Sequence, residues 1–438
     1  MKDTVVVADV EVAKGAPTDS GAGQVAVPAG LKNLHDVGHQ VRLIREALQS
    51  EKRRLGFFLG AGCPLGIYDK DGKESLRRIP DVAGLTATVC AELDGEGDFK
   101  ASWAKLTAAC KTDKVPVPNV EHILTQIRTI CGLKGTAQVD GMPADGLRKL
   151  DTKICELIAK TVGKGLPEHT NSYHRFAAWI GQIDRASPVE VFTPNYDLLL
   201  EEALEQYKVP FFDGFVGTRE PFFDLAAMEQ DKIPLRWARL WKLHGSINWI
   251  KREDGSVFRC SHPARPKEGQ QLLIYPSHLK YEQSRRMPYL AMIDRLREFF
   301  RDINPVLVVC GYSFTDDHLN EVLLDGLRGN RSAHCFALAY PGIKECEIAA
   351  RYASRRANLS VLARDGGVIG TRRGIYKPID PSTISAGVGF DALPPSENAL
   401  GEKLGAGQFL LGDFQHFALF LETQFGVKAT DQQGTEAR

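Results

Sequence analysis

The feature that most constrains the fold is a series of short apolar runs in which polar and apolar residues do not alternate. Strands have this composition when helices cover both faces of a parallel sheet. Helical patterns lie between several of the runs, so the sequence predicts an α/β fold with a doubly wound, mainly parallel sheet. The runs are Leu55–Leu59, Val189–Thr193, Leu240–Leu243, Leu272–Tyr275, Val306–Cys310, Cys335–Ala339 and Leu359–Leu362.

The spacing of these runs predicts one large domain with insertions. The stretch between the first two runs is mainly helical and much longer than a single crossover helix, so we expect a helical subdomain at about 85–185. A second, aromatic-rich insertion is expected at about 211–237. The main domain should cover 34–365, preceded by a poorly ordered arm over 1–33 and followed by an extension over 366–438 that packs on the core or at a subunit interface.

Composition narrows the class of protein. Basic and acidic residues balance at 55 each, which argues against binding of nucleic acid through bulk charge. The sequence lacks both a membrane-spanning apolar stretch and a secretory signal, so we expect a cytoplasmic protein that does not bind membranes. The nine cysteines include no Cys-x-x-Cys pair, which favours reduced thiols and predicts no four-cysteine zinc site and no other metal site.

The first motif is Phe57–Gly62, in which a strand runs directly into Gly60 and Gly62. Glycines at this point let the backbone approach a pyrophosphate. The free backbone N–H groups at the start of a following helix stabilise the negative charge of the pyrophosphate. A tight strand-to-helix turn without a ligand would have the same composition, so the segment alone leaves both interpretations open.

The second motif is Thr193–Asp197, at the end of another predicted strand. Ligands bind at the carboxyl ends of strands in open α/β sheets, so Asn195 and Asp197 would face one there. Either side chain could instead cap the helix that follows.

Two further motifs also close predicted strands. His244, followed by Gly245, can take a proton from water or from a sugar hydroxyl, although a single histidine is more often structural. In the segment from Gly311 to His318, Ser313 can donate to ribose or phosphate oxygens, while Thr315 or Asp316 could simply cap a helix.

In combination these motifs resemble those of sirtuin-like domains, which have a Rossmann-like fold and bind NAD. The long helical insertion and the Asn-Tyr-Asp and Gly-Tyr-Ser-Phe forms resemble the bacterial antiphage branch of that superfamily rather than the protein deacetylases. The resemblance spans roughly 55–340. It rests on Gly60–Gly62, Ile79–Asp81, Thr193–Asp197, His244–Ser246 and Gly311–Ser313.

The resemblance implies roles for four residues on the nicotinamide side. Asn195 would orient the attacking water or the ribose, and His244 would be the general base. Asp81 would lie near the nicotinamide pocket, and Asp197 would support the nicotinamide side. Asn195 and His244 are therefore the expected catalytic pair.

The resemblance also implies contacts to the rest of the dinucleotide. Gly60, Ala61 and Gly62 would lie at the diphosphate, and Gly311 and Ser313 would meet the adenosine half. NAD would be a substrate, not a resident cofactor.

The activity implied is hydrolysis of NAD+ at the nicotinamide–ribose bond, giving nicotinamide and ADP-ribose. The alternatives are an NAD-dependent deacylase or ADP-ribosyltransferase, and a non-catalytic sensor of NAD or ADP-ribose. The absence of paired Cys-x-x-Cys motifs favours hydrolysis over deacylation. The resemblance further implies a NAD-depleting defence effector that acts as a homo-oligomer under a regulatory partner such as a HerA-like ATPase.

Overall fold

The computed structural model describes residues 33–69, 77–94, 97–112, 117–132, 144–264, 266, 270–274, 288–377 and 408–425, together with short strands at 390–391, 396–397 and 403–404. The N-terminal arm expected over 1–33 lies outside the described residues apart from Asn33, as does much of the extension expected over 366–438.

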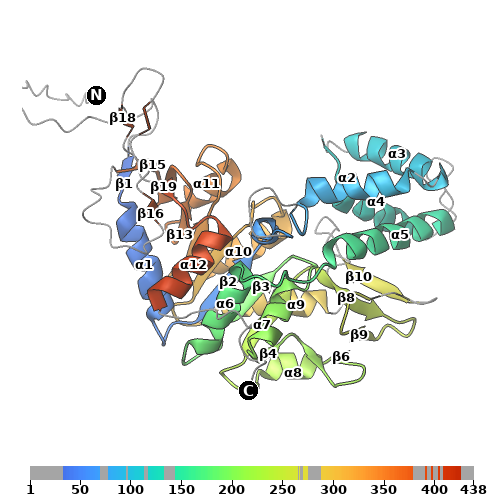
Figure 1. Cartoon of the computed structure of the whole chain (residues 1–438), viewed down its shortest axis with the longest axis horizontal. Coiled ribbons are helices and arrows are strands. Elements are labelled where there is room, and N and C mark those ends of the chain that lie inside the picture. Colours follow the sequence, from blue (N-terminus) through green and yellow to red (C-terminus); the bar gives the residue numbers. More distant parts are fainter. Residues whose placement is uncertain are drawn as a thin grey trace, which may run out of the picture.

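A ten-stranded sheet forms the centre of the molecule (Figure 1). Its order is β1-β15-β14-β13-β12-β11-β2-β3-β7-β4, and every neighbouring pair from β13 to β4 is parallel. The mainly parallel α/β fold predicted from the apolar runs is therefore confirmed. The strands are β1 (Asn33–His35), β2 (Leu55–Leu59), β3 (Glu190–Thr193), β4 (Phe211–Phe212), β7 (Ala238–Lys242), β11 (Val306–Cys310), β12 (His334–Leu338), β13 (Leu359–Leu362), β14 (Gly366–Ile369) and β15 (Arg372–Tyr376).

Helices cover both faces of this sheet, as expected for a doubly wound fold. Neighbouring residues of β2 point to opposite faces, so that Phe57 belongs to one apolar core and Phe58 to the other. On the Phe57 side lie α1 (Val37–Gln49), α6 (Ser172–Gln182), α7 (Leu199–Gln206) and α12 (Phe414–Phe425). On the Phe58 side lie α9 (Tyr289–Phe299), α10 (Asp317–Gly329) and α11 (Glu347–Ala353).

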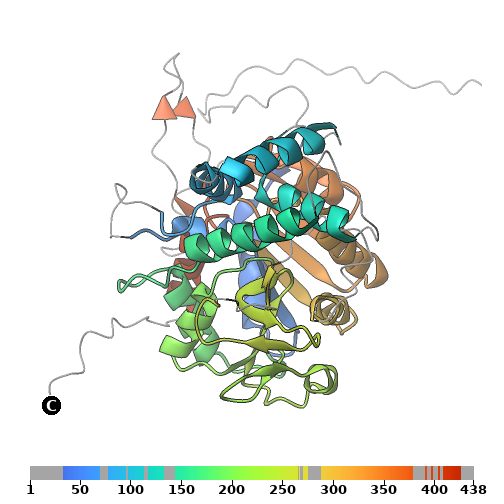
Figure 2. The same ribbon diagram turned by 90° about the vertical axis from the view of Figure 1, so that its right-hand side faces the viewer.

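Four helices between β2 and β3 form the inserted helical subdomain (Figures 1 and 2). The last helix of the predicted insertion, α6, does not belong to this bundle, because its apolar face packs on the sheet. The Phe57 and Phe176 rings lie 4.9 Å apart, centroid to centroid. The helices of the bundle are α2 (Val82–Leu93), α3 (Gly97–Thr112), α4 (Val120–Gly132) and α5 (Ala144–Val162).

A second, five-stranded sheet lies beside the helical bundle, with β10 against α5. The prediction that the apolar run at Leu272–Tyr275 belongs to the parallel sheet is wrong, because β10 pairs antiparallel with β8. The run is nevertheless apolar throughout because Leu272 and Leu273 are buried on opposite sides. The order is β10-β8-β9-β6-β5, formed by β10 (Gln271–Ile274), β8 (Gly245–Lys251), β9 (Val257–Arg259), β6 (Phe222–Phe223) and β5 (Phe215–Val216).

The second predicted insertion therefore divides between two sheets. Its first strand, β4, adds an edge to the central sheet, whereas β5 and β6 join the second sheet and α8 (Leu225–Gln230) follows them. Strands β8 to β10 complete the second sheet. They follow β7 in the chain and therefore lie outside the predicted insertion, which ends at about residue 237.

The last described helix returns to the core of the molecule. Helix α12 packs along α6, where Arg175 Nε lies 2.8 Å from Glu422 Oε2 and the rings of Tyr173 and Phe414 are in edge contact. Strands β14 and β15 continue the central sheet beyond residue 365, so the sheet extends past the predicted domain end. None of the described helices is long and apolar enough to cross a lipid bilayer.

Candidate active site

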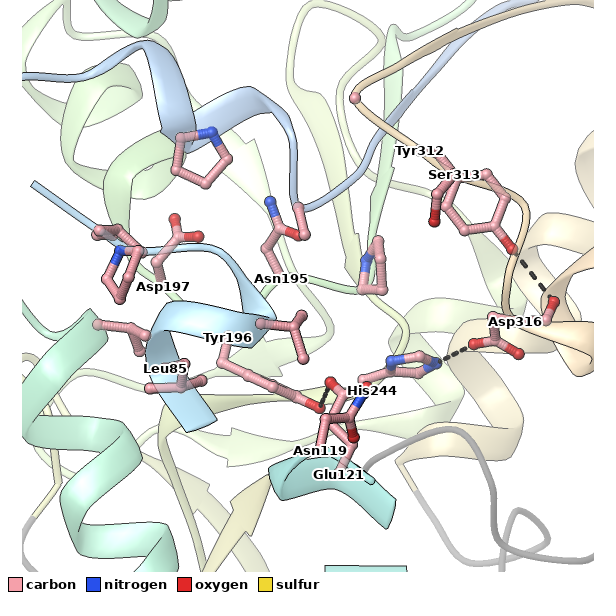
Figure 3. Close-up of a pocket in the computed structure, with 18 of the residues that line it drawn as sticks. Leu85, Asn119, Glu121, Asn195, Tyr196, Asp197, His244, Tyr312, Ser313 and Asp316 are labelled. Carbon is pink, nitrogen blue, oxygen red and sulfur yellow. Dashed lines mark hydrogen bonds and ion pairs between the residues drawn. The ribbon is translucent and has the colours of Figure 1, made fainter. Parts of the chain in front are cut away.

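The candidate site is a pocket of about 450 Å³ at the carboxyl edge of the central sheet (Figure 3). The loops after β2, β3, β7 and β11 form its floor, and the start of α2, the start of α4 and the end of α5 add walls from the helical bundle. Asn195 and His244, which follow different strands, line this one pocket. Ala61, Asp197, Gly311 and Ser313 line it as well.

The glycines after β2 allow two loops to approach each other closely. Gly60 N–H donates to Cys310 O and Gly62 N–H donates to Gly311 O, both at 2.8 Å. A Cβ atom at position 60 would lie 2.4 Å from Gly311 O. These two amides are therefore engaged by the loop after β11 and are not free for an anion. The diphosphate role of Gly60, Ala61 and Gly62 stays a prediction, and of the three only Ala61 lines the pocket.

Asn195 is tied to the two neighbouring strands. Its backbone N–H donates to Thr193 Oγ1 at 3.1 Å, and its side-chain Nδ2 donates to Gly60 O at 3.1 Å. Thr193 in turn donates through Oγ1 to Leu59 O at 2.7 Å. The carboxamide is therefore held in one orientation, facing into the pocket (Figure 3).

His244 lies in the tight turn between β7 and β8. Leu243 N–H donates to Thr193 O at 2.8 Å, which fixes the start of the turn. Gly245 has a positive φ of 86°, and a Cβ there would lie 2.1 Å from Leu273 O, so the turn requires glycine. The His244 side chain is 13% exposed, and its Nε2 lies 3.1 Å from Asp316 Oδ2.

Asp197 combines a contact to the start of α7 with a buried carboxyl group in the pocket wall. Its Oδ1 accepts from Leu199 N–H, in the first residue of α7, at 3.1 Å, while the N-cap position itself is Leu198. Burial raises the pKa of Asp197 to about 6, an effect that the nearby Lys242 ammonium partly offsets. The Lys242 Nζ donates to the Asp197 backbone oxygen and lies 2.7 Å from Glu201 Oε1.

The loop after β11 supplies Gly311, Ser313 and Asp316. Gly311 has a positive φ of 65°, and a Cβ there would lie 2.6 Å from Cys63 N, in the loop after β2. Ser313 Oγ is exposed and lies 2.9 Å from Thr315 Oγ1. Asp316 caps α10, because its Oδ1 accepts from His318 N–H and Leu319 N–H at 3.0 and 3.2 Å.

Asp81 is the one acidic residue predicted for the site that does not line the pocket. It is exposed and caps α2, where its Oδ1 accepts from Gly84 N–H at 2.7 Å. Its neighbours Ile79, Pro80 and Val82 form part of the pocket wall. A role of Asp81 beside nicotinamide stays a prediction.

Sequence reasoning missed the contribution of the helical bundle. Asn119, Glu121 and His122, at the start of α4, line the pocket opposite the sheet. The Tyr196 hydroxyl donates to Glu121 Oε1 at 3.1 Å, which joins the bundle to the loop after β3. The sequence signal for this contribution was Asn119 directly before an apolar helix. Such an Asn indicates a helix cap, but it does not indicate that the capped end lies beside a pocket.

The described residues contain no group of three or more His, Cys, Asp or Glu side chains arranged to hold a metal ion. The pocket combines an oriented carboxamide, an imidazole and the carboxyl groups of Glu121, Asp197 and Asp316. Such a set can activate water and stabilise developing positive charge.

A comparison with protein families matches a segment that carries part of this pocket. Residues 189–360 match the SIR2-like domain family. The matched SIR2-like segment begins at β3 and ends within β13, so it contains Asn195, Asp197, His244 and the loop after β11. No curated protein matches the chain.

Solved structures similar to the chain include Sir2 proteins. One, described as the structural basis for the mechanism and regulation of Sir2 enzymes, is 14% identical, covers 69% of this chain and 85% of its own, and has a TM-score of 0.33. Another, a Sir2 homologue in complex with NAD, is 15% identical, covers 70% of this chain and 84% of its own, and has a TM-score of 0.32.

Proposed function

We propose that the protein binds NAD+ in this pocket and hydrolyses the nicotinamide–ribose bond, giving nicotinamide and ADP-ribose. The observation that carries the proposal is that Asn195 and His244 line one pocket beside the glycine loops, within the SIR2-like segment. The SIR2-like match supports an NAD-dependent enzyme, and hydrolysis is our own inference.

The chemistry explains why these residue types are needed. Departure of nicotinamide leaves positive charge on the ribose, which oriented dipoles and nearby carboxylates stabilise. The Asn195 carboxamide would orient the ribose or the attacking water, and Asp197 and Glu121 would supply negative charge. His244 would accept the proton of the water as it attacks the ribose C1′ atom. Diphosphate contacts would come from Ala61, and Gly311 and Ser313 would meet the adenosine half.

The biological setting belongs to the same proposal. The motif forms that resemble the bacterial antiphage branch support a NAD-depleting effector that works as a homo-oligomer. A regulatory partner such as a HerA-like ATPase would control it. These assignments rest on the sequence resemblance alone.

The test is a product analysis of purified protein with NAD+ in H₂¹⁸O. Hydrolysis predicts equal amounts of nicotinamide and ADP-ribose, with one ¹⁸O atom in the ADP-ribose. An acyl-lysine peptide in a parallel reaction distinguishes deacylation, which would give O-acyl-ADP-ribose instead.

The His244→Ala variant connects this activity to the pocket. We expect turnover to fall by about 10²- to 10⁴-fold, the range for loss of a general base. His39→Ala, which removes an exposed histidine on α1, is the matched control and should retain full activity. Unchanged NAD+ hydrolysis by folded His244→Ala protein would refute the assignment.

A further inference from the structure

The structure points to a second role for the residue that caps α10. We propose that Asp316 is a positioning residue that holds His244 with its proton on Nε2 and so leaves Nδ1 as the proton acceptor. The inference rests on the proposed function for its catalytic consequence, whereas the tautomer itself does not depend on any activity.

The two carboxylate oxygens of Asp316 face different groups. Oδ1 accepts from the first backbone N–H groups of α10, at 3.0 and 3.2 Å, and Oδ2 lies 3.1 Å from His244 Nε2. Both side chains are largely buried, with 10% of the Asp316 side chain and 13% of the His244 side chain exposed. In Figure 3 the His244 imidazole points toward the Asp316 carboxylate. A helix cap alone would use only the first oxygen.

The loop that carries Asp316 is fixed by its own hydrogen bonds. The Tyr312 hydroxyl contacts Asp316 O at 3.2 Å and Asn320 Oδ1 at 2.9 Å. Asn320, buried on α10, donates through Nδ2 to Phe314 O at 2.8 Å. Phe314 has a positive φ of 58°, a conformation that a non-glycine residue keeps only when its surroundings enforce it. The carboxylate therefore has a defined direction before any ligand binds.

The chemistry of a carboxylate decides which histidine nitrogen carries the proton. An ionised carboxylate has no proton to share, and two lone pairs 3.1 Å apart would repel each other, so the Nε2 beside Oδ2 carries the proton. With the proton on Nε2, the lone pair on Nδ1 can accept a proton from water or a hydroxyl group. The other titratable groups lining this pocket are Glu121, His122, Tyr196, Asp197 and Tyr312.

The Asp316→Asn variant separates positioning from capping. Asparagine caps helices as well as aspartate does, so α10 should be retained. Its amide nitrogen, however, would donate to Nε2 and move the proton to Nδ1, the wrong tautomer for a base at that atom. We expect kcat to fall by about 10²- to 10⁴-fold with KM for NAD+ changed less than about threefold.

The matched control is Asp317→Asn, one residue further along. It removes the same charge from the first turn of the same helix, but its side chain is exposed and lies outside the pocket lining. Its kcat should stay within about twofold of the native value, because a surface charge at a helix end contributes little. Equal losses in the two variants, or an Asp316→Asn kcat within threefold of native, would overturn the catalytic role.

The tautomer is measured independently of activity by ¹⁵N NMR of histidine-labelled native protein at about pH 8.5, with the His244 signals assigned from His244→Gln. Nε2-protonated and Nδ1-unprotonated signals are expected, with the reverse in Asp316→Asn. A proton on Nδ1 of the native protein overturns the proposal, whether or not the enzyme turns over NAD+. If the native protein lacks hydrolysis but has the expected tautomer, the proposed function fails and the positioning contact stands.

Discussion

Asp197 shows how one side chain serves both the fold and the pocket. Its carboxylate accepts from Leu199 N–H and is buried in the pocket wall. Burial raises its pKa to about 6, above the ordinary value near 4, so the folded protein binds this proton more tightly than the unfolded chain does. The stability that Asp197 contributes is therefore greatest at low pH and is lost as pH rises through its folded-state pKa.

We predict that Asp197→Asn gains stability over the native protein as pH increases. At about pH 4 both side chains are neutral, whereas at pH 7 only the native protein carries the buried charge. The difference in free energy of unfolding should grow by about 2 kcal/mol over this range. Urea denaturation at several pH values measures it, with Asp184→Asn, an exposed carboxylate after α6, as the control. Parallel pH profiles for Asp197→Asn and native protein would show that the pKa is not raised.

Part of the candidate site could be predicted from the sequence. Asn195 and His244 could be assigned to one pocket because each follows a buried strand of a parallel sheet, and such strand ends share an edge. The contact between His244 and Asp316 could not be predicted, because a capping aspartate has the same sequence signature whether or not its second oxygen faces a histidine. Asp81 was predicted beside the pocket, but its carboxylate turns outward to cap α2.

At the scale of elements, the pocket depends on the contact between the loops after β2 and β11. Gly60, Gly62 and Gly311 let these backbones touch, and two hydrogen bonds join them. The glycines that the sequence analysis assigned to dinucleotide binding therefore also have a structural function, which does not depend on any ligand.

Gly311→Ala should destabilise the protein more than Gly255→Ala. Both glycines have a positive φ, at 65° and 85°, so alanine strains the backbone at each. At position 311 the new Cβ also meets Cys63 N at 2.6 Å, whereas nothing lies within 4 Å at position 255. We expect an additional loss of about 1–3 kcal/mol for Gly311→Ala. Urea unfolding of both variants measures the difference, and equal losses would mean that the loop contact is not tight.

Element type was predicted better than element pairing. The apolar runs located six of the ten strands of the central sheet, whereas β1, β4, β14 and β15 were not predicted. The run at β10 has the same composition but pairs antiparallel in the second sheet. An uninterrupted apolar run reports burial on both sides and carries no information about strand direction. The short strands β5 and β6 could not be predicted, because each is only two residues long.

At the scale of the whole molecule, the inserted helical bundle closes over the carboxyl edge of the sheet. Its α4 supplies Asn119, Glu121 and His122 to the pocket, and the Tyr196–Glu121 hydrogen bond joins the two parts. A helical insertion between β2 and β3 could be predicted from sequence, but its end could not, because α6 packs on the sheet. The position of the insertion over the pocket could not be predicted either, because it depends on contacts between residues far apart in the chain.

The most direct test is a crystal structure of the His244→Ala variant with NAD+. We predict the nicotinamide ribose between Asn195 and position 244, the diphosphate beside Ala61, and the adenosine half beside Gly311 and Ser313. The groove lined by Arg53, Arg331 and His334, at the opposite edge of the sheet, provides an internal comparison. NAD+ bound in that groove, or absent from the pocket at saturating concentration, would contradict the assignment of this pocket as the site of NAD+ cleavage.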